Sequence, residues 1–410
     1  MKFFQSFSWA IWGRFFHVLS QAAIIIFFTK NFSNTLIGYF GIANAITSPL
    51  FQFSNMNLRT IIVTDKNNQF SFENYFNVRV CNNCISFILI VLFASFFSDS
   101  YQLTLAIVII AFSKFIENIS DNYHAFFQKN DYQDIIAKSL MLRSFIVSLI
   151  LVICWLSIDN FLYILMLIYF SIVIPLIFWD VPICFKKLGF KYSIANFKEF
   201  KKNYLKINRL GFSLGLTATL TSFNSSVPRL IIAKYLSIEA LGIFVPIGYL
   251  NTALGNFVAT IKTVMLPRIT KLHNQNKLLF KKSIFSLIFI GILIGFSQAL
   301  LFYIFGEKIL SILFTSESSE YLNVLIIILV SLGFTYAKGF IFSGLIVIRK
   351  HDIQPLIILT GLFFNIIFGL IMIPKMSLIG AAITILGTNL IIFFLALIYF
   401  LKKIETDFVK

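Results

Sequence analysis

Charged residues, and acidic ones above all, are scarce in this chain. Only 12% of its 410 residues are Asp, Glu, Lys or Arg, whereas a soluble globular protein has about 25%. Acidic residues number 17 against 34 Lys and Arg, and 58% of the chain is hydrophobic. This composition predicts a polytopic membrane protein. The net charge of +17 does not indicate a nucleic-acid partner, because most of the charges lie in short segments between apolar runs.

Motifs for nucleotide, metal or covalent chemistry are also missing. No G-x-x-x-x-G-K-[ST] sequence is present, which excludes the phosphate-binding loop of an ATPase, and neither G-x-S-x-G nor H-E-x-x-H occurs. Four cysteines are present, and Cys81-Asn-Asn-Cys84 has CxxC spacing. We interpret them as packing residues, because no second pair or clustered His accompanies them. The sequence therefore predicts no metal, no cofactor and no enzymatic activity.

Apolar runs of about 20 residues, the length that crosses a bilayer, occur along the whole chain. We predict an all-α fold with twelve transmembrane helices. The predicted spans are residues 9–29, 36–57, 76–97, 102–125, 137–157, 160–181, 209–232, 240–262, 283–305, 321–345, 355–374 and 377–400.

Lys and Arg concentrate at alternate ends of these spans, and cytoplasmic loops of membrane proteins are rich in basic residues. Both termini are therefore expected in the cytoplasm, and residues 182–208 form a basic cytoplasmic linker that rests on anionic lipid. The linker divides the chain into two bundles of six spans, residues 1–181 and 209–410. The predicted outer loops carry only Lys30, Lys234, Lys308 and Lys375.

The two halves look duplicated. Residues 37–45 align with 241–249 at an offset of 204, and residues 128–135 align with 349–356 at an offset of 221. Because six is an even number, both halves enter the membrane in the same sense. Such repeats are related by an axis along the membrane normal, with the substrate site between them near the midplane.

Five basic residues lie inside predicted spans, where a charge at the bilayer centre costs about 2.5–3.5 kcal/mol. Other polar side chains recur at helical spacing beside them in spans 1, 4, 7 and 10, which occupy corresponding places in the two halves. We predict that the five basic residues line a central hydrated cavity and bind an anionic substrate. For the polar residues of any single span, the alternative role is to form interhelical hydrogen bonds or ion pairs. The five are Arg14, Lys114, Arg143, Arg229 and Lys338.

Four further ionisable residues are candidates for coupling or gating. His17 shares a helix face with Arg14, Arg59 follows span 2, and Glu117 and Asp121 lie one turn apart in span 4. Intramembrane carboxylates are the usual carriers of proton or sodium coupling. Coupling to H⁺ or Na⁺ is therefore one interpretation of this set.

The other interpretation is structural. Glu117 and Asp121 would then hold Lys114 and Arg143 in ion pairs, which would neutralise charge inside the membrane. We favour this second interpretation. Asp180, at the end of span 6, is expected at the membrane interface.

Four segments resemble the polysaccharide flippases of the multidrug/oligosaccharidyl-lipid/polysaccharide (MOP) superfamily, especially O-antigen flippases of the Wzx type. Ser377 stands where that family commonly has glycine. The segments are Asn57-Leu-Arg-Thr-Ile-Ile-Val-Thr-Asp65, Glu117-Asn-Ile-Ser-Asp121 with Gln128, Pro228-Arg-Leu-Ile-Ile with Leu241-Gly-Ile-Phe244, and Ile373-Pro-Lys-Met-Ser-Leu-Ile-Gly-Ala-Ala382.

The resemblance implies a V of two six-helix bundles that opens alternately to the two sides of a bacterial inner membrane. The implied substrate is an O-antigen or capsule repeat unit on undecaprenyl pyrophosphate, moved from the cytoplasmic to the periplasmic leaflet. Basic cavity residues would bind its phosphates, and arginine can do so bidentately. Membrane lipids, a polysaccharide polymerase and a chain-length regulator are the implied partners.

Three other functions remain as alternatives. A cation-coupled drug exporter of the same fold would favour an acidic, aromatic cavity, whereas the predicted cavity is basic. A lipid II flippase tends towards two additional C-terminal spans. A membrane-embedded polysaccharide polymerase or glycosyltransferase would be expected to carry a larger outer segment than any predicted here.

Overall fold

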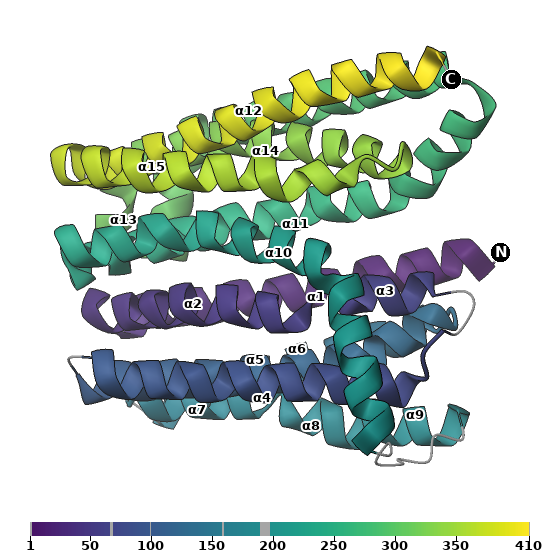
Figure 1. Ribbon diagram of the computed structural model, residues 1–410. Coiled ribbons are helices and arrows are strands. Elements are labelled where there is room, and N and C mark those ends of the chain that lie inside the picture. Colours follow the sequence, from purple (N-terminus) through teal and green to yellow (C-terminus); the bar gives the residue numbers. More distant parts are fainter. Residues whose placement is uncertain (1, 66–68, 99, 158–159, 189–196, 410) are drawn as a thin grey trace. The chain divides into compact units, whose positions relative to one another are not determined.

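The computed structural model describes every residue except 1, 66–68, 99, 158–159, 189–196 and 410 (Figure 1). Its regular elements, within that described part, are all helices. In the first half of the chain these are α1 (Lys2–Asn31), α2 (Asn34–Asn55), α3 (Leu58–Thr64), α4 (Phe72–Phe97), α5 (Tyr101–Lys129), α6 (Gln133–Ser157), α7 (Phe161–Phe170), α8 (Val173–Pro175), a π-helical turn (Leu176–Asp180) and α9 (Val181–Leu188).

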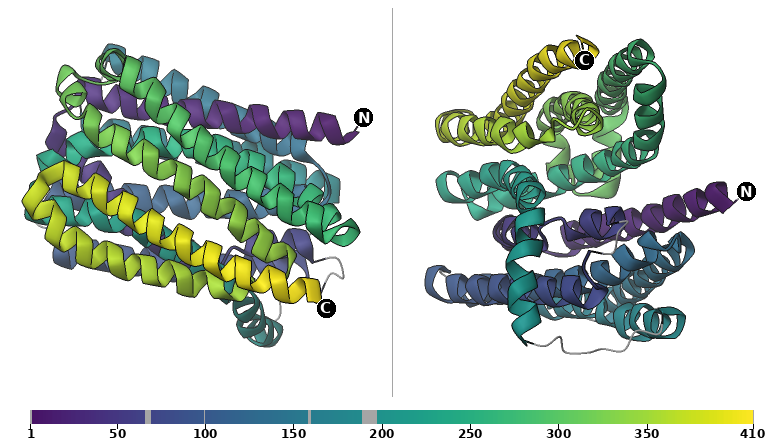
Figure 2. Two further views of the ribbon diagram at one scale, coloured as in Figure 1. Left: turned by 90° about the horizontal axis from the view of Figure 1, so that it is seen from above. Right: turned by 45° about the vertical axis from the view of Figure 1, so that its right-hand side comes forward.

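The second half continues with five long helices and two short ones. These are α10 (Phe197–Tyr235), α11 (Ile238–Gln275), α12 (Lys277–Leu313), α13 (Ser316–Glu320), α14 (Leu322–Val347), a 3₁₀ turn (His351–Ile353) and α15 (Gln354–Val409). Most helices of each half run alongside one another (Figure 2).

Polar residues at the helix starts explain where several helices begin. An N-cap side chain accepts a hydrogen bond from a backbone N–H that has no partner inside the helix. Ser71, Ser100, Asn160, Ser237 and Asn276 do so for α4, α5, α7, α11 and α12. Short polar segments between apolar runs therefore set the helix boundaries.

Each of the twelve predicted spans falls largely on helical structure. Among the described residues, nine helical segments are long and apolar enough to cross a membrane. One of them, within α15, contains a break at Ser377 (φ 56°, ψ −139°) that divides it into two helices. α2 and α10 are not among the nine and carry several polar residues. The structure is therefore an all-α polytopic membrane protein, consistent with twelve spans.

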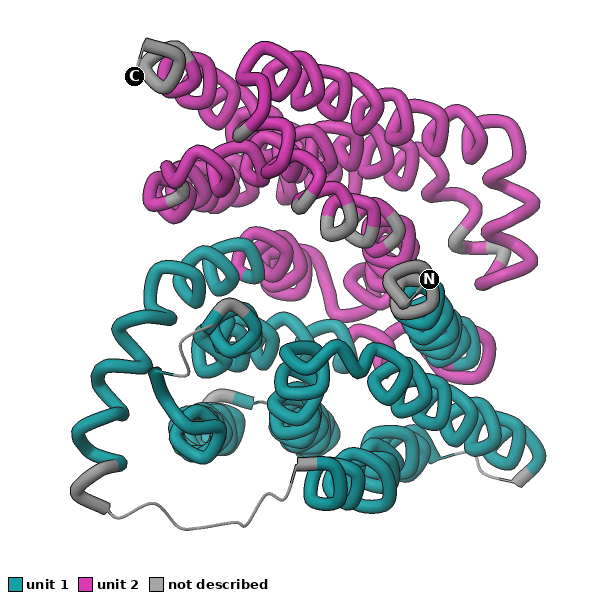
Figure 3. Tube along the Cα trace, turned by 90° about the vertical axis from the view of Figure 1, so that its right-hand side faces the viewer, with its two compact units in different colours: residues 1–27, 39–222 teal, residues 28–38, 223–410 magenta. Residues whose placement is uncertain are grey.

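The chain forms two compact units (Figure 3). Unit 1 comprises residues 1–27 and 39–222, and unit 2 comprises residues 28–38 and 223–410. The sequence placed the boundary in the linker at 182–208 instead. Where this linker is described, it is helical, because α9 extends to Leu188 and α10 begins at Phe197; residues 189–196 lie outside the described part.

The first part of α10 belongs to unit 1 because it packs on α3 and α4. Tyr204 and Phe200 lie against a buried apolar cluster to which Ile207 contributes. Gly211 lets α10 approach the connection between α2 and α3 closely, since a Cβ at this position would lie 2.7 Å from the carbonyl oxygen of Met56. The buried members of the cluster are Met56, Leu58, Ile62, Tyr75, Val78, Ala125 and Ile207.

Residues 28–38 belong to unit 2 because the start of α2 packs on the start of α11. A Cβ on Gly38 would lie 2.2 Å from the carbonyl oxygen of Ile238, and one on Gly242 would lie 1.9 Å from that of Asn34. Thr35 donates a hydrogen bond of 2.9 Å to Glu239. The residue numbers of Asn34 and Ile238 differ by 204, and so do those of Gly38 and Gly242. This is the offset of the first sequence repeat. The contact is therefore locally two-fold symmetric, as expected where duplicated segments pack on one another.

The rest of unit 2 is built around α14. Its residues Leu325, Ile328, Leu329 and Phe340 are at most 1% exposed, and α12, α15 and α11 pack on it. Figure 1 shows α12, α14 and α15 side by side. α14 is consequently the central helix of this unit, and a charge on it is shielded from lipid by its neighbours.

Candidate functional site

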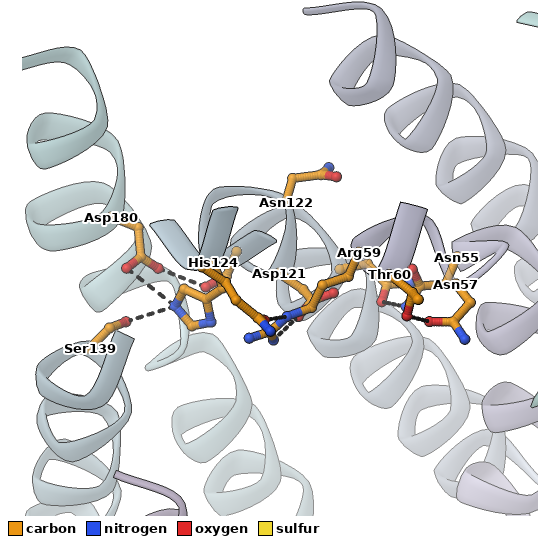
Figure 4. Close-up of polar contacts among 12 residues, drawn as sticks. Asn55, Asn57, Arg59, Thr60, Asp121, Asn122, His124, Ser139 and Asp180 are labelled. Carbon is orange, nitrogen blue, oxygen red and sulfur yellow. Dashed lines mark hydrogen bonds and ion pairs between the residues drawn. The ribbon is translucent and has the colours of Figure 1, made fainter. Parts of the chain in front are cut away.

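Asp121 is the centre of a charged cluster in unit 1. Its Oδ1 lies 2.6 Å from Arg59 Nη1, and its Oδ2 lies 2.6 Å from Arg79 Nη2. Arg59 also donates through Nε to Gln128 Oε1 at 2.9 Å. Figure 4 shows Arg59 reaching from its own helix to Asp121. One carboxylate therefore holds two guanidinium groups in place.

Arg59 reaches Asp121 because α2 ends abruptly. Met56 and Asn57 both have left-handed backbone conformations (φ 48° and 49°), which separate α2 from α3. At the other end of α3, Asp65 accepts hydrogen bonds from the N–H of Gln69 and the hydroxyl of Tyr75. Desolvation works against the charged carboxylate, but these hydrogen bonds hold the pKa of Asp65 below its usual value. The short helix α3 is thereby fixed at both ends.

Arg79, near the start of the predicted span 76–97, was not among the predicted site residues. Its side chain is fully buried within α4, and its Nη1 donates to Asn122 Oδ1 at 3.1 Å. Burial of a charge is tolerated when a counter-charge and hydrogen bonds accompany it. The sequence shows Arg79 near the predicted start of span 3, but only the fold brings Asp121 to it.

A second polar network lies beside the first along α5 and includes Ser120 and His124. Asp180 is completely buried and accepts a hydrogen bond of 2.7 Å from Ser120. Its Oδ1 lies 3.4 Å from His124 Nε2, which also lies 3.3 Å from Ser139 Oγ (Figure 4). Asp180 is buried because the π-helical turn Leu176–Asp180 packs on α5; its expected position at the membrane interface stays a prediction.

Arg143 joins this network. Its Nη2 donates to Ser120 Oγ at 3.3 Å, and its Nη1 lies 3.6 Å from Glu117 Oε1. Glu117 and Asp121 thus both lie in ion pairs, which is the arrangement that the structural interpretation requires. The partners differ in part from those expected, since Asp121 binds Arg59 and Arg79. Lys114 donates a short hydrogen bond to Ser48 Oγ.

Arg14 and His17 lie on α1 in unit 1. Arg14 is exposed. Within the described residues its guanidinium has no hydrogen bond or ion pair. His17 Nδ1 is buried without a described hydrogen-bond partner. Arg14 is therefore the one predicted substrate residue of unit 1 whose charge no described side chain contacts directly.

The predicted basic residues of unit 2 have different surroundings. Arg229 on α10 lies over the ring of Tyr249, 6.0 Å from its centroid. Lys338 on α14 donates to Asn389 Oδ1 at 2.7 Å, and Asn389 donates in turn to Ser331 Oγ at 2.7 Å. Among the described residues, neither cation contacts a carboxylate. Both are held by neutral groups.

Lys262, the last residue of the predicted span 240–262, is a third cation of this kind and was not among the predicted site residues. It lies well inside α11 (Ile238–Gln275), and its ammonium group would lie 3.9 Å from a Cβ on Gly339, the residue after Lys338. No described carboxylate contacts it. No local spacing pattern points to Lys262, because the backbone that its ammonium group approaches, at Gly339, lies on another helix.

The five predicted substrate residues are divided between the units. Arg14, Lys114 and Arg143 lie in unit 1, and Arg229 and Lys338 lie in unit 2. Of these, Arg143 contacts a carboxylate. A cavity to which both halves contribute stays a prediction.

A model of a family described as polysaccharide biosynthesis protein matches residues 9–323. The chain belongs to this family. The capsular polysaccharide biosynthesis protein CapF of Staphylococcus aureus is 32% identical over 382 residues, which cover 90% of this chain and 91% of CapF. The resemblance to polysaccharide proteins noted on sequence is thereby confirmed.

Solved structures identify the fold of this polysaccharide biosynthesis protein. The lipid II flippase MurJ in an inward closed conformation has a TM-score of 0.72 at 15% identity, covering 94% of this chain and 86% of MurJ. A multidrug resistance MATE transporter of the MOP superfamily, inward-facing, has a TM-score of 0.63 at 13% identity, covering 98% and 94%. A mutant of the Vibrio cholerae MATE transporter VcmN has a TM-score of 0.64 at 12% identity, covering 99% and 97%. The predicted MATE-like fold class is confirmed.

Proposed function

We propose that this polysaccharide biosynthesis protein is a flippase for a lipid-linked oligosaccharide. The substrate would be an O-antigen or capsule repeat unit on undecaprenyl pyrophosphate, moved by alternating access from the cytoplasmic to the periplasmic leaflet of the bacterial cytoplasmic membrane. Its family supplies the link to polysaccharide, and its fold is that of membrane transporters. Both termini would lie in the cytoplasm, as the distribution of Lys and Arg indicates.

The observation that carries this proposal is the absence of described carboxylates beside Arg229, Lys262 and Lys338. A charge at membrane depth is rare and marks a substrate path or a partner. Cations held by neutral groups are available to an anion, whereas cations in ion pairs are not. A sugar diphosphate is such an anion, and Arg229 could bind its oxygens bidentately.

The charged residues of unit 1 support a structural role. Glu117 and Asp121 both lie in ion pairs, so a coupling cation would have to displace a guanidinium group to reach either one. We therefore infer that these two carboxylates stabilise unit 1. Coupling by H⁺ or Na⁺, if transport uses it, would depend on other residues. A polymerase and a chain-length regulator remain proposed partners.

Transport by the purified protein in liposomes tests the function. An undecaprenyl-pyrophosphate oligosaccharide is placed in the inner leaflet, and its arrival outside is followed with a membrane-impermeant lectin. We expect wild-type protein to expose the sugar and Arg229→Ala to do so at least tenfold more slowly. Arg229→Lys should be intermediate, because lysine keeps the charge but loses the bidentate contact.

Lys234→Ala is the matched control, because Lys234 lies on the same helix and is exposed at its end. It should transport as wild type does. Sugar exposure no faster than in protein-free liposomes would contradict the proposal. Transport of organic cations in place of the glycolipid would favour the drug-exporter alternative.

A further inference from the structure

α11 and α14 pack in parallel with a constant register. A Cβ placed on Gly255 would lie 4.0 Å from Leu332, and one placed on Gly339 would lie 3.6 Å from Lys262 Cδ and 3.9 Å from its Nζ. The residue numbers differ by 77 at both contacts. This register brings the ammonium group of Lys262 against the backbone at Gly339, next to Lys338.

The absence of a side chain at Gly339 allows this approach. The stem of Lys262 lies along α14 at the glycine, so that its ammonium group remains beside Lys338 rather than extending to an aqueous end of α11. Lys338 lies nine residues before the end of α14 (Leu322–Val347), about 14 Å at the helical rise. Lys338 therefore lies within the apolar span Leu322–Val347, and Lys262 approaches it from the part of α11 that follows the apolar span Ile238–Asn256.

Lys338 is held in a fixed direction. Ser331 Oγ accepts from Asn389 Nδ2, which orients the amide so that Asn389 Oδ1 accepts from Lys338 Nζ. An ammonium group has three N–H donors, and this contact uses one of them. Lys262 has no hydrogen bond to any residue in the described part of the chain. Several donors of the pair are thus available to a ligand.

The ammonium group of Lys262 approaches the turn of α14 that carries Lys338. Like charges so placed repel one another, and folding alone gives no reason to keep them. An anion with two negative groups removes this repulsion and supplies acceptors to both ammonium groups. A carboxylate or a single phosphate monoester anion offers one such group, whereas a diphosphate offers two adjacent phosphoryl groups. The geometry favours a diphosphate.

We propose that Lys262 and Lys338, with Asn389 as a positioning residue, form a binding site for the diphosphate of the lipid-linked substrate. This inference rests on the proposed flippase function and adds to it a site within unit 2. Lysine acts on phosphate as a point charge without the fork of arginine. The affinity of the site would accordingly depend on the number of phosphoryl groups and not on the sugar.

Binding to the purified full-length chain in nanodiscs tests the site. Undecaprenyl diphosphate and undecaprenyl monophosphate are the two probes, and native mass spectrometry gives their dissociation constants. Lys262→Gln and Lys338→Gln should each weaken diphosphate binding about tenfold, the loss expected for one charge-assisted contact, and should change monophosphate binding much less. The double variant should lose less than the product of the two, because both groups bind one anion.

Asn389→Asp provides an independent variant. It gives Lys338 a carboxylate partner of similar size and should weaken diphosphate binding at least as much as Lys338→Gln. Lys308→Gln, at an exposed lysine of α12, is the matched control and should bind as wild type does. Thermal unfolding of every variant shows whether the fold is retained.

Two results would overturn the site. One is wild-type diphosphate affinity in the double variant; the other is an equal loss for both probes, which would indicate a general change in the protein. Either result, with lectin-detected transport intact in the wild type, leaves the flippase function standing. Failure of the wild type to transport the glycolipid would contradict the function itself.

Discussion

The membrane-embedded charges of the two units differ in how they are neutralised. In unit 1, Asp121 binds Arg59 and Arg79, and Glu117 pairs with Arg143. In unit 2, Arg229 and Lys338 contact an aromatic ring and an amide. The same residue types thus serve two purposes. The basic residues of unit 1 are structural because acidic residues of the same unit pair with them. Arg229 and Lys338 contact no described acidic residue, so their charges are available to a ligand.

This difference has an energetic reason. Removing one partner of a buried ion pair leaves an uncompensated charge and costs about 3–5 kcal/mol. Removing a cation that has no counter-charge leaves nothing uncompensated and relieves an unfavourable burial. Substitutions in the two units should therefore change stability in opposite directions.

Asp121→Asn should have the largest effect. It leaves Arg79 fully buried without its counter-charge, and we expect a loss of about 3 kcal/mol in the free energy of unfolding. Denaturant unfolding in detergent micelles measures this loss. Combining it with Arg79→Gln should recover part of the stability. Wild-type stability in Asp121→Asn would remove the distinction between the units.

Gly242→Ala tests the helix packing of unit 2 without changing any charge. The added Cβ would lie 1.9 Å from the carbonyl oxygen of Asn34, so α2 and α11 must move apart. We expect a loss of about 2 kcal/mol, the usual range for overpacking, in the same unfolding measurement. Gly248→Ala is a milder control, because its nearest contact would be the Arg229 side chain at 3.3 Å. Equal stability of both variants would show that the α2–α11 contact does not form.

Lys262→Met should stabilise the protein, by about 1 kcal/mol, since it removes a cation that repels Lys338 from an apolar setting. A rise in the unfolding midpoint together with weaker diphosphate binding is the expected combination. A destabilisation comparable with that of Asp121→Asn would show that Lys262 is structural after all, and the contrast between the units would fail.

Ser377→Gly should have the smallest effect. Ser377 adopts a conformation that favours glycine (φ 56°, ψ −139°), and relief of this strain is partly offset by the greater chain entropy of glycine. We expect a gain of about 0.5 kcal/mol, measured by thermal unfolding, and unchanged transport, because no proposed site residue lies nearby in sequence. Reduced transport in this variant would indicate that the bend at Ser377 takes part in the mechanism.

The sequence located the charges better than it located their partners. Glu117 and Asp121 were predicted on one helix, and both lie on α5. The structural interpretation expected Arg143 to pair with an acidic residue, and its partner is Glu117. The sequence did not single out Arg79 or Lys262, which lie near the ends of the predicted spans 76–97 and 240–262, because a hydropathy window marks where a helix is apolar and not where it ends. α4 and α11 both continue through charged residues that neighbouring helices shield.

Composition and local spacing were enough to predict the membrane class, the helical fold, the places of the apolar segments and the repeat at an offset of 204. Which charges are neutralised follows instead from how the helices pack. Asp121 meets Arg59 and Arg79 across long stretches of chain, and Lys262 meets Lys338 through the register of two packed helices. Charge pairing depends on distances of a few ångströms between helices, and no local pattern specifies them.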